Sequence, residues 1–432
     1  MNINLLSQNL LILFVFLTTA LLVFLTLRLI EKKRYKALYI VPAIGVVVAV
    51  ALQLWLRHQF PEDQLPLIGL MALPLLVSIP LVFFVWKKNN WWIRATSIIA
   101  IPISLLLAVL LVNNYYQYYP KLHDVFSSDT HHAAEFVTPL PKHTNQKQTI
   151  EDVATQLANA PKEGHVYPLA IPGTKSHFNA REGWIYIPPA AYTAQRLSLP
   201  VVVLLGGIPG GPKDWIAAGG ADTILDAFAS KHHGVTPIVV GADSLGTPFN
   251  DTECVDSPRG NAETYLTQDL PAYIRAQFDV SSNPAKWAIG GLSDGGMCGA
   301  MLALRHPDTY RYFLDFGGSL GPSINNSKVK TISTLFAGSE TAWQDHQIDY
   351  ILAHLNPQTS QVGGYFTVGD SDSRQSIAEA NGLYQSAIKG RLNTVFRSLP
   401  GHHTFDVWKL SLTLALPWLS NQLGATNCEQ GC

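Results

Sequence analysis

Four long stretches without a charged residue begin within the first 113 residues, and they restrict the fold of this chain more than any other feature. They are Met1–Leu27, Ala37–Leu56, Gln64–Trp86 and Ala95–Pro120. Each stretch is long enough to cross a hydrocarbon core of about 30 Å as a helix. The first one lacks the basic start and the small-residue cleavage site of a signal peptide. We therefore predict a region of four transmembrane helices over residues 1–113.

The loops between these stretches differ in charge, and the difference predicts an orientation. The basic residues of the first loop are Arg28, Lys32, Lys33, Arg34 and Lys36, and those of the third are Lys87, Lys88 and Arg94. The second loop has only Arg57, beside two acidic residues. Because Lys and Arg are enriched in cytoplasmic loops, the first and third loops are expected in the cytoplasm. The N-terminus and everything after residue 113 are then extracytoplasmic, in a multi-pass protein of the cell membrane.

The rest of the chain divides by composition. Residues 114–164 are polar and predict an extracytoplasmic tether, residues 165–425 are long enough for one full-sized globular domain, and residues 426–432 form a polar tail. The net charge is −1 at pH 7. Such a balance provides no basic patch, so we expect no nucleic-acid partner.

Within the globular part, residues 291–295 form a Gly-x-Ser-x-Gly pentapeptide with Ser293 at its centre. A short apolar run, residues 286–290, precedes it and is typical of a strand. A run of small residues, 297–304, follows and is typical of a helix packed on a sheet. A nucleophile elbow has this strand–turn–helix order, in which flanking glycines leave room for a serine lifted above the sheet. The pattern predicts Ser293 as a nucleophile.

An acid and a histidine follow in the order that such a nucleophile requires. Residues 366–369 indicate a strand that ends at Asp370 and Asp372, and residues 394–399 indicate another that leads to His402 and His403. The imidazole would take the serine proton, and the carboxylate would orient the imidazole and stabilise its charged form. The pattern itself does not choose between the two aspartates or between the two histidines.

A tetrahedral oxyanion also needs two fixed N–H donors. One is expected from the backbone of Asp294, the residue after the nucleophile. The other is expected from the glycine-rich loop 206–211, which follows the strand-like residues 201–205. This loop has neither the ending of a P-loop nor the spacing of a dinucleotide site. We predict the N–H of Ile208 as the second donor.

Four stretches in this order resemble one known family. They are LLGGIPGGPKDW, ETYLTQDLPAYI, AIGGLSDGGMCGAMLALRHPDTY and PGHHTFDVW. Together they look like the putative-esterase family of α/β-hydrolases, which includes esterase D and the actinobacterial mycolyltransferases. The resemblance covers residues 165–420. It implies an α/β-hydrolase fold, a mostly parallel sheet with helices on both faces, here preceded by the four transmembrane helices.

The resemblance also selects among the candidate residues. It implies Ser293 as the nucleophile and His403 as the catalytic histidine, because a small and an aromatic residue follow His403 as in the family's motif. His402 stands where the family has a glycine. The family's acid ends a G-x-x-D turn, which implies Asp372 and leaves Asp370 as the alternative. Mycolyltransferases carry an acidic residue and an arginine near the oxyanion loop to hold a sugar acceptor, and this sequence has neither there.

The four cysteines are expected to pair in an oxidising compartment. They are Cys254, Cys298, Cys428 and Cys432. Cys254 follows a strand-like run and Cys298 opens the helix after the elbow, so both should lie near the rim of the site. We favour a Cys254–Cys298 disulfide, with Cys428–Cys432 closing a loop in the tail; four free thiols are the alternative. No spacing indicates a metal site, and no cofactor is expected.

The sequence therefore predicts a membrane-anchored serine esterase with its site outside the cytoplasm. The expected substrate is an ester of a lipid or envelope component, such as aminoacyl-phosphatidylglycerol or an acyl glycolipid. The four helices would hold the domain at the membrane or bind a membrane-protein partner. An acyltransferase that acts on a sugar or lipid hydroxyl is the first alternative, and a non-catalytic envelope scaffold is the second.

Overall fold

The computed structural model describes residues 3–59, 68–86, 90–122, 125, 162–192 and 199–426. The chain divides into two compact units, Met1–Ser128 and Asp129–Cys432. Each unit is described by itself. Most of the predicted tether, and the tail with Cys428 and Cys432, lie outside the described residues.

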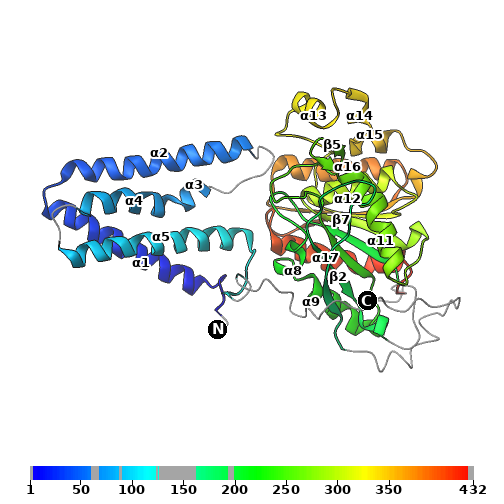
Figure 1. Ribbon diagram of the computed structural model, residues 1–432, viewed down its shortest axis with the longest axis horizontal. Coiled ribbons are helices and arrows are strands. Elements are labelled where there is room, and N and C mark those ends of the chain that lie inside the picture. Colours follow the sequence, from blue (N-terminus) through cyan, green and yellow to red (C-terminus); the bar gives the residue numbers. More distant parts are fainter. Residues whose placement is uncertain are drawn as a thin grey trace. The chain divides into compact units, whose positions relative to one another are not determined.

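The N-terminal unit consists of helices (Figure 1). They are α1 (Gln8–Glu31), α2 (Tyr35–Gln59), α3 (Ile68–Met71), α4 (Leu73–Trp86) and α5 (Trp91–Tyr116). Three described segments are long and apolar enough to cross a membrane: Gln8–Glu31, Tyr35–Arg57 and Trp91–Tyr116. Many of their apolar side chains face outward, for example Phe16, Val47 and Val109. Helices that are apolar on the outside suit a lipid surrounding.

The prediction of four long membrane helices is wrong for the stretch Gln64–Trp86. Its described part is divided between α3 and α4, and α4 has only 14 residues. At about 1.5 Å per residue this is shorter than the hydrocarbon core. Pro74 explains the division, because it has no N–H for the carbonyl one turn earlier and restricts the backbone of Leu73.

The second unit is built on an eight-stranded sheet in the order β1-β2-β4-β3-β7-β8-β9-β10. Its strands are β1 (His165–Leu169), β2 (Gly183–Ile187), β3 (Val201–Leu205), β4 (Ile238–Ala242), β7 (Trp287–Leu292), β8 (Tyr312–Phe316), β9 (Gly363–Gly369) and β10 (Asn393–Leu399). Only β1 with β2 and β2 with β4 pair antiparallel. The central strands are buried on both faces, as expected for parallel strands rich in apolar residues. A separate two-stranded ribbon joins β5 (Asp256–Ser257) and β6 (Gly260–Asn261).

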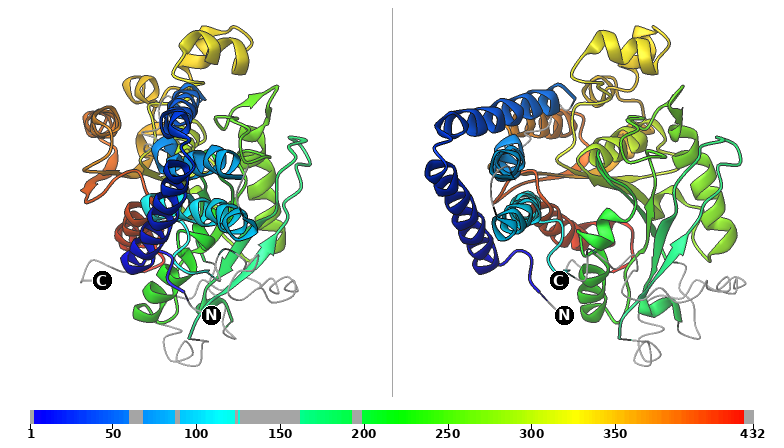
Figure 2. Two further views of the ribbon diagram at one scale, coloured as in Figure 1. Left: turned by 90° about the vertical axis from the view of Figure 1, so that its left-hand side faces the viewer. Right: turned by 60° about the vertical axis from the view of Figure 1, so that its left-hand side comes forward.

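Helices cover both faces of the sheet (Figures 1 and 2). The helices are α8 (Asp214–Ala217), α9 (Ala221–Lys231), α10 (Ala262–Thr264), α11 (Leu270–Gln277), α12 (Asp294–Arg305), α13 (Lys328–Leu335), α14 (Glu340–Gln344), α15 (Ile348–Ala353), α16 (Arg374–Lys389) and α17 (Phe405–Gln422). Side chains of α11, α12 and α16 share one core with alternate strand residues such as Val201, Val203 and Leu205. Helices α9 and α17 pack together on the opposite face. This is a mixed, mostly parallel α/β sheet of the hydrolase type.

The small residues after the elbow let α12 lie very close to the sheet. A Cβ atom at Gly299 would stand 2.4 Å from the Cα of Gly290 on β7. No real side chain tolerates such a distance, so the two glycines permit the close approach. The approach brings the start of α12 directly over the carboxyl ends of β7 and β8.

Candidate active site

Ser293 stands at the sharp turn between β7 and α12. Its φ and ψ are 54° and −124°, a backbone conformation that side chains rarely adopt and that is found at functional turns. Three backbone hydrogen bonds hold it: the N–H of Ser293 donates to the Phe316 carbonyl at 2.9 Å, and the Ser293 carbonyl accepts from the N–H groups of Gly296 and Met297 at 2.8 and 3.2 Å. A Cβ at Gly291 would stand 2.2 Å from the Leu205 carbonyl oxygen. The flanking glycine is therefore required by the neighbouring strand.

Three side chains from separate strand ends meet at this turn. The Nε2 atom of His403 lies 2.9 Å from the Oγ of Ser293, and its Nδ1 atom lies 2.9 Å from Oδ2 of Asp372. The Asp372 side chain is 3% exposed and the His403 side chain 21% exposed. In the tautomer that this carboxylate favours, Nδ1 donates to Asp372 and Nε2 accepts the serine proton. The arrangement can activate Ser293 as a nucleophile.

The two alternative residues lie on the same loops but do not join this chain of hydrogen bonds. Asp370 is exposed, and its Oδ1 accepts from the N–H of Gly401 at 3.1 Å and from the hydroxyl of Ser371 at 2.9 Å. His402 is also exposed, and its Nδ1 donates to the carbonyl of Ser371 at 2.7 Å. The contacts of both residues connect the β9 loop to the β10 loop, which suggests a structural role for each.

The environment of Asp372 keeps its carboxyl group charged. Burial by itself would raise its pKa, but the hydrogen bond and charge of His403, the N–H of Ser373 and the charge of His402 outweigh that effect. The pKa of Asp372 is therefore held below its usual value. A charged carboxylate here stabilises the imidazolium that forms when His403 accepts a proton. The indole of Trp408 meets the His403 ring edge to face at 5.0 Å and restricts its orientation.

The glycine-rich loop 206–211 lies against the nucleophile. A Cβ at Gly207 would stand 3.1 Å from the Cβ of Ser293, so the backbone of this loop passes directly beside the serine. Ile208 comes next, and no acceptor in the described part of the chain takes its N–H. Asp294 follows Ser293 at the first position of α12. The loop residue before Ile208 therefore lies beside Ser293, and the assignment of the Ile208 and Asp294 N–H groups as oxyanion donors stays a prediction.

Sequence reasoning did not find Arg181 and Asp243, which lie beside the same loop. The guanidinium of Arg181 donates to the Gly210 carbonyl at 2.9 Å and to Oδ1 of Asp243 at 2.6 Å. Asp243 directly follows β4, and a carboxylate at the carboxyl end of a central strand was the available signal. Nothing in the segment around Arg181 marks it as part of a motif.

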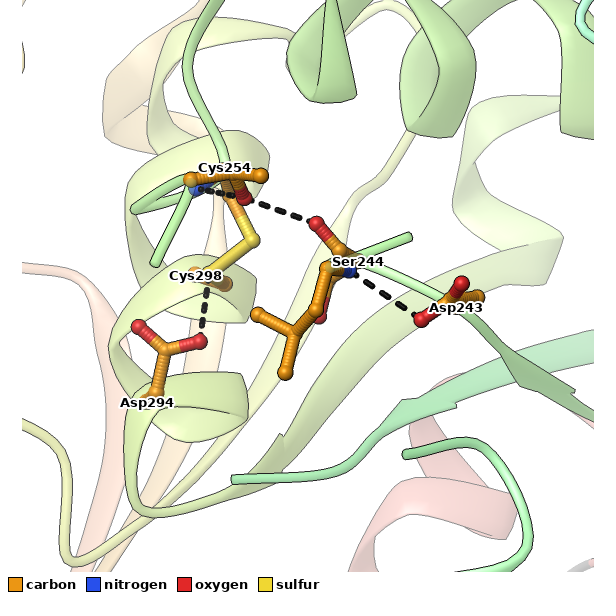
Figure 3. Close-up of a disulfide and its surroundings, with 7 residues drawn as sticks. Asp243, Ser244, Cys254, Asp294 and Cys298 are labelled. Carbon is orange, nitrogen blue, oxygen red and sulfur yellow. Dashed lines mark hydrogen bonds between the residues drawn. A yellow bond between two sulfur atoms is a disulfide. The ribbon is translucent and has the colours of Figure 1, made fainter. Parts of the chain in front are cut away.

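A disulfide joins Cys254 and Cys298 next to the elbow (Figure 3). Cys298 lies on α12, and its Sγ is 3.7 Å from Oδ2 of Asp294. Cys254 lies on the long segment after β4, so the bond ties that segment to the nucleophile helix. Both cysteines are fully buried.

The fold and the geometry together define a class, the serine hydrolases built on an α/β-hydrolase sheet. Residues 178–419 match the family described as "Putative esterase". Because the match covers more than half of the chain, the protein belongs to this esterase family.

Its relatives show how far the similarity extends. An uncharacterized protein of Corynebacterium glutamicum is 29% identical over 359 residues, which are 81% of this chain and 80% of that protein. A diacylglycerol acyltransferase/mycolyltransferase, Ag85B, of Mycobacterium avium is 26% identical over 191 residues, which are 38% of this chain and 57% of that protein. A solved ferulic acid esterase aligns with 60% of this chain and 98% of its own, with a TM-score of 0.52 and 18% identity. That last likeness shows the fold alone.

Proposed function

We propose that this protein is a membrane-anchored serine esterase whose catalytic unit faces away from the cytoplasm. The observation that carries the proposal is the continuous hydrogen-bond chain from Ser293 through His403 to Asp372, with 2.9 Å at each step. Membership of the esterase family supports the same chemistry.

The reaction follows from the positions of these groups. His403 takes the hydroxyl proton as the Ser293 oxygen attacks the ester carbonyl. The N–H groups of Ile208 and Asp294 bind the oxygen that becomes negative. The C–O bond of the ester breaks, and the leaving alcohol takes the proton from His403. Water then attacks the acyl-serine with the same proton transfers in reverse order, which releases the acid and restores the serine.

The substrate that we favour is an ester of a lipid or a lipid-linked envelope component. The described part of the N-terminal unit has three helices long and apolar enough to cross a membrane. Phe249 is 70% exposed and Val329 is 80% exposed, the two largest values among the described large apolar residues of the catalytic unit. Phe249 adjoins the oxyanion loop, because the carbonyl of Pro248 accepts from the N–H of Gly210 at 3.2 Å. An exposed apolar side chain next to the oxyanion loop suits an apolar substrate.

Acyl transfer is the second candidate, favoured by the similarity to a relative named as an acyltransferase. Transfer to a sugar is disfavoured by two residues of the oxyanion loop. Gly206 and Pro209 stand where mycolyltransferases carry an acid and an arginine. Arg181 and Asp243 lie nearby but bind each other. We therefore favour water as the acceptor. A non-catalytic scaffold is disfavoured because such a protein has no need of a complete and connected triad.

The test uses the full-length protein in detergent with a short-chain nitrophenyl ester and a fluorophosphonate probe. Wild type should hydrolyse the ester and react with the probe, and Ser293→Ala should lose both, by several orders of magnitude in turnover. Ser333→Ala, an exposed serine on α13, is the matched control and should behave as wild type. An unreactive wild type, or a Ser293→Ala variant with more than about a tenth of the activity, would refute the proposal.

A further inference from the structure

We propose that Arg181 is a positioning residue for this reaction, which fixes the oxyanion loop through its carbonyl at Gly210. The inference rests on the proposed function, because it assigns the loop 206–211 the role of an oxyanion hole. Arg181 would act through the backbone of the loop, at the Gly210 carbonyl.

Arg181 is bound in a way that leaves its guanidinium little freedom. Its Nε and one terminal nitrogen donate to the two oxygens of Asp243, at 3.1 and 2.6 Å. Its backbone N–H donates to the same carboxylate at 2.7 Å. The remaining terminal nitrogen donates to the Gly210 carbonyl at 2.9 Å. The Asp243 side chain is fully buried and the Arg181 side chain is 27% exposed, so the pair is a fixed support for the loop.

The loop needs such a support because four of its six residues are glycine. Glycine has the widest backbone freedom and does not hold a shape by itself. The outer part of the loop is held by the bond from Arg181 to the Gly210 carbonyl and by the bond from the Gly210 N–H to Pro248. Asp214 holds Gly211 twice: its Oδ2 accepts from the Gly211 N–H at 2.8 Å, and its N–H donates to the Gly211 carbonyl at 3.2 Å. Oxyanion donors stabilise a transition state only within a narrow range of distance. Loss of one fixed point should therefore move the N–H of Ile208.

Asp243 extends this support to the other side of Gly210. Its two oxygens also accept the N–H groups of Leu245 and Gly246, at 3.1 and 3.0 Å. These residues begin the segment that contains Pro248 and leads to Cys254. Figure 3 shows Asp243 at the start of this segment, beside Ser244. The buried Asp243 carboxylate thus positions both partners of Gly210: Arg181, which donates to its carbonyl, and the segment of Pro248, which accepts from its N–H.

A lysine cannot reproduce this geometry. The planar guanidinium binds both oxygens of Asp243 and still directs a further N–H at Gly210, whereas an ammonium is a single point charge. Arg181→Lys should therefore keep the charge beside Asp243 and lose the hold on Gly210. The Arg181→Lys variant therefore distinguishes the proposed positioning of Gly210 from a role in which Arg181 only neutralises the charge of Asp243.

The experiment compares full-length wild type with Arg181→Lys and Arg181→Ala. Lys213→Ala is the matched control, because Lys213 lies just after the loop and its ion pair with Glu182, 3.8 Å long, is exposed on both sides. We expect kcat to fall about 10- to 100-fold in both Arg181 variants, with KM within about threefold of wild type. The affinity for an alkyl boronic acid, whose adduct with serine places an anionic oxygen in the hole, should fall by the same factor as kcat. Methylguanidinium should restore part of the kcat of Arg181→Ala and leave the control unchanged.

The inference is overturned if Arg181→Lys keeps the wild-type kcat, or if its loss lies in KM and leaves boronate affinity unchanged. If Arg181→Ala does not fold, Arg181→Lys alone decides by the same two measurements. The proposed function itself fails on a separate result. It fails if wild type does not hydrolyse the ester, or if wild type and Ser293→Ala hydrolyse it equally.

Discussion

The bond between Cys254 and Cys298 should contribute a large part of the stability of the catalytic unit. The two cysteines are 44 positions apart. A cross-link closing a loop of this length removes chain entropy from the unfolded state that corresponds to about 4 kcal/mol at 25 °C. For a domain of this size, each kcal/mol changes the melting temperature by roughly 2–4 °C. Loss of the disulfide should therefore lower the melting temperature by roughly 8–16 °C.

Tryptophan fluorescence of the full-length protein in detergent measures this change, since Trp184, Trp215 and Trp287 are fully buried in the catalytic unit. Wild type is heated with and without reductant, beside the double variant Cys254→Ala/Cys298→Ala. Reductant should lower the melting temperature of wild type and leave that of the double variant unchanged. The loop-entropy reasoning fails if wild type loses less than about 3 °C, or if reductant lowers both proteins equally.

Three further predictions concern the triad, a buried acid and the membrane orientation. His403→Ala and Asp372→Asn should lose activity like Ser293→Ala, while His402→Ala and Asp370→Asn keep most of it; nitrophenyl ester assays that show the reverse for either pair would reassign that loop. Burial raises the pKa of Asp315 to about 7, so its contribution to stability is present below about pH 4 and is lost as the pH rises through 7. Asp315→Asn should remove this decline from the free energy of unfolding measured between pH 4 and 8, and unchanged curves would exclude it. A cysteine at Gln59 or in residues 140–149 should react with an impermeant maleimide in intact cells, and one at Asn89 only after permeabilisation; the opposite labelling would place the triad in the cytoplasm.

The sequence was most informative where function depends on local order along the chain. A nucleophile elbow is a strand, a glycine-flanked serine and a helix in succession, so residues 287–305 could be interpreted directly. The acid and the histidine were predictable as classes, because parallel strands bring their carboxyl ends to one edge of the sheet. The choice within each pair depends on the turn of the loop. The N–H of Asp372 closes a turn onto Gly369 at 3.2 Å, and only the resemblance to the family's G-x-x-D turn favoured the carboxylate that points toward the histidine.

Other features depended on contacts between distant positions and could not be predicted. Arg181 and Asp243 are 62 positions apart, and neither belongs to a recognisable motif. The long hydrophobic stretch before Trp86 had the composition of a membrane helix, but the effect of Pro74 is local and hydropathy does not include it. Composition therefore predicted that the N-terminal helices are apolar, but it did not predict how long each helix is.

Contacts within the helical unit bear on its orientation in the membrane, although only three of its described helices are long enough to cross one. The N–H of Leu5 donates to the Pro120 carbonyl, and the N–H of Leu122 donates to the Ile3 carbonyl, each at 2.9 Å. The segments before α1 and after α5 therefore lie at the same end of this unit. Three full crossings alone would separate these segments by the thickness of a membrane, and within this unit the chain returns through the shorter α4, which packs against both α2 and α5. We therefore predict that both ends of this unit lie on one side of the membrane, and the basic residues around Lys33, at its opposite end, predict that this side is extracytoplasmic.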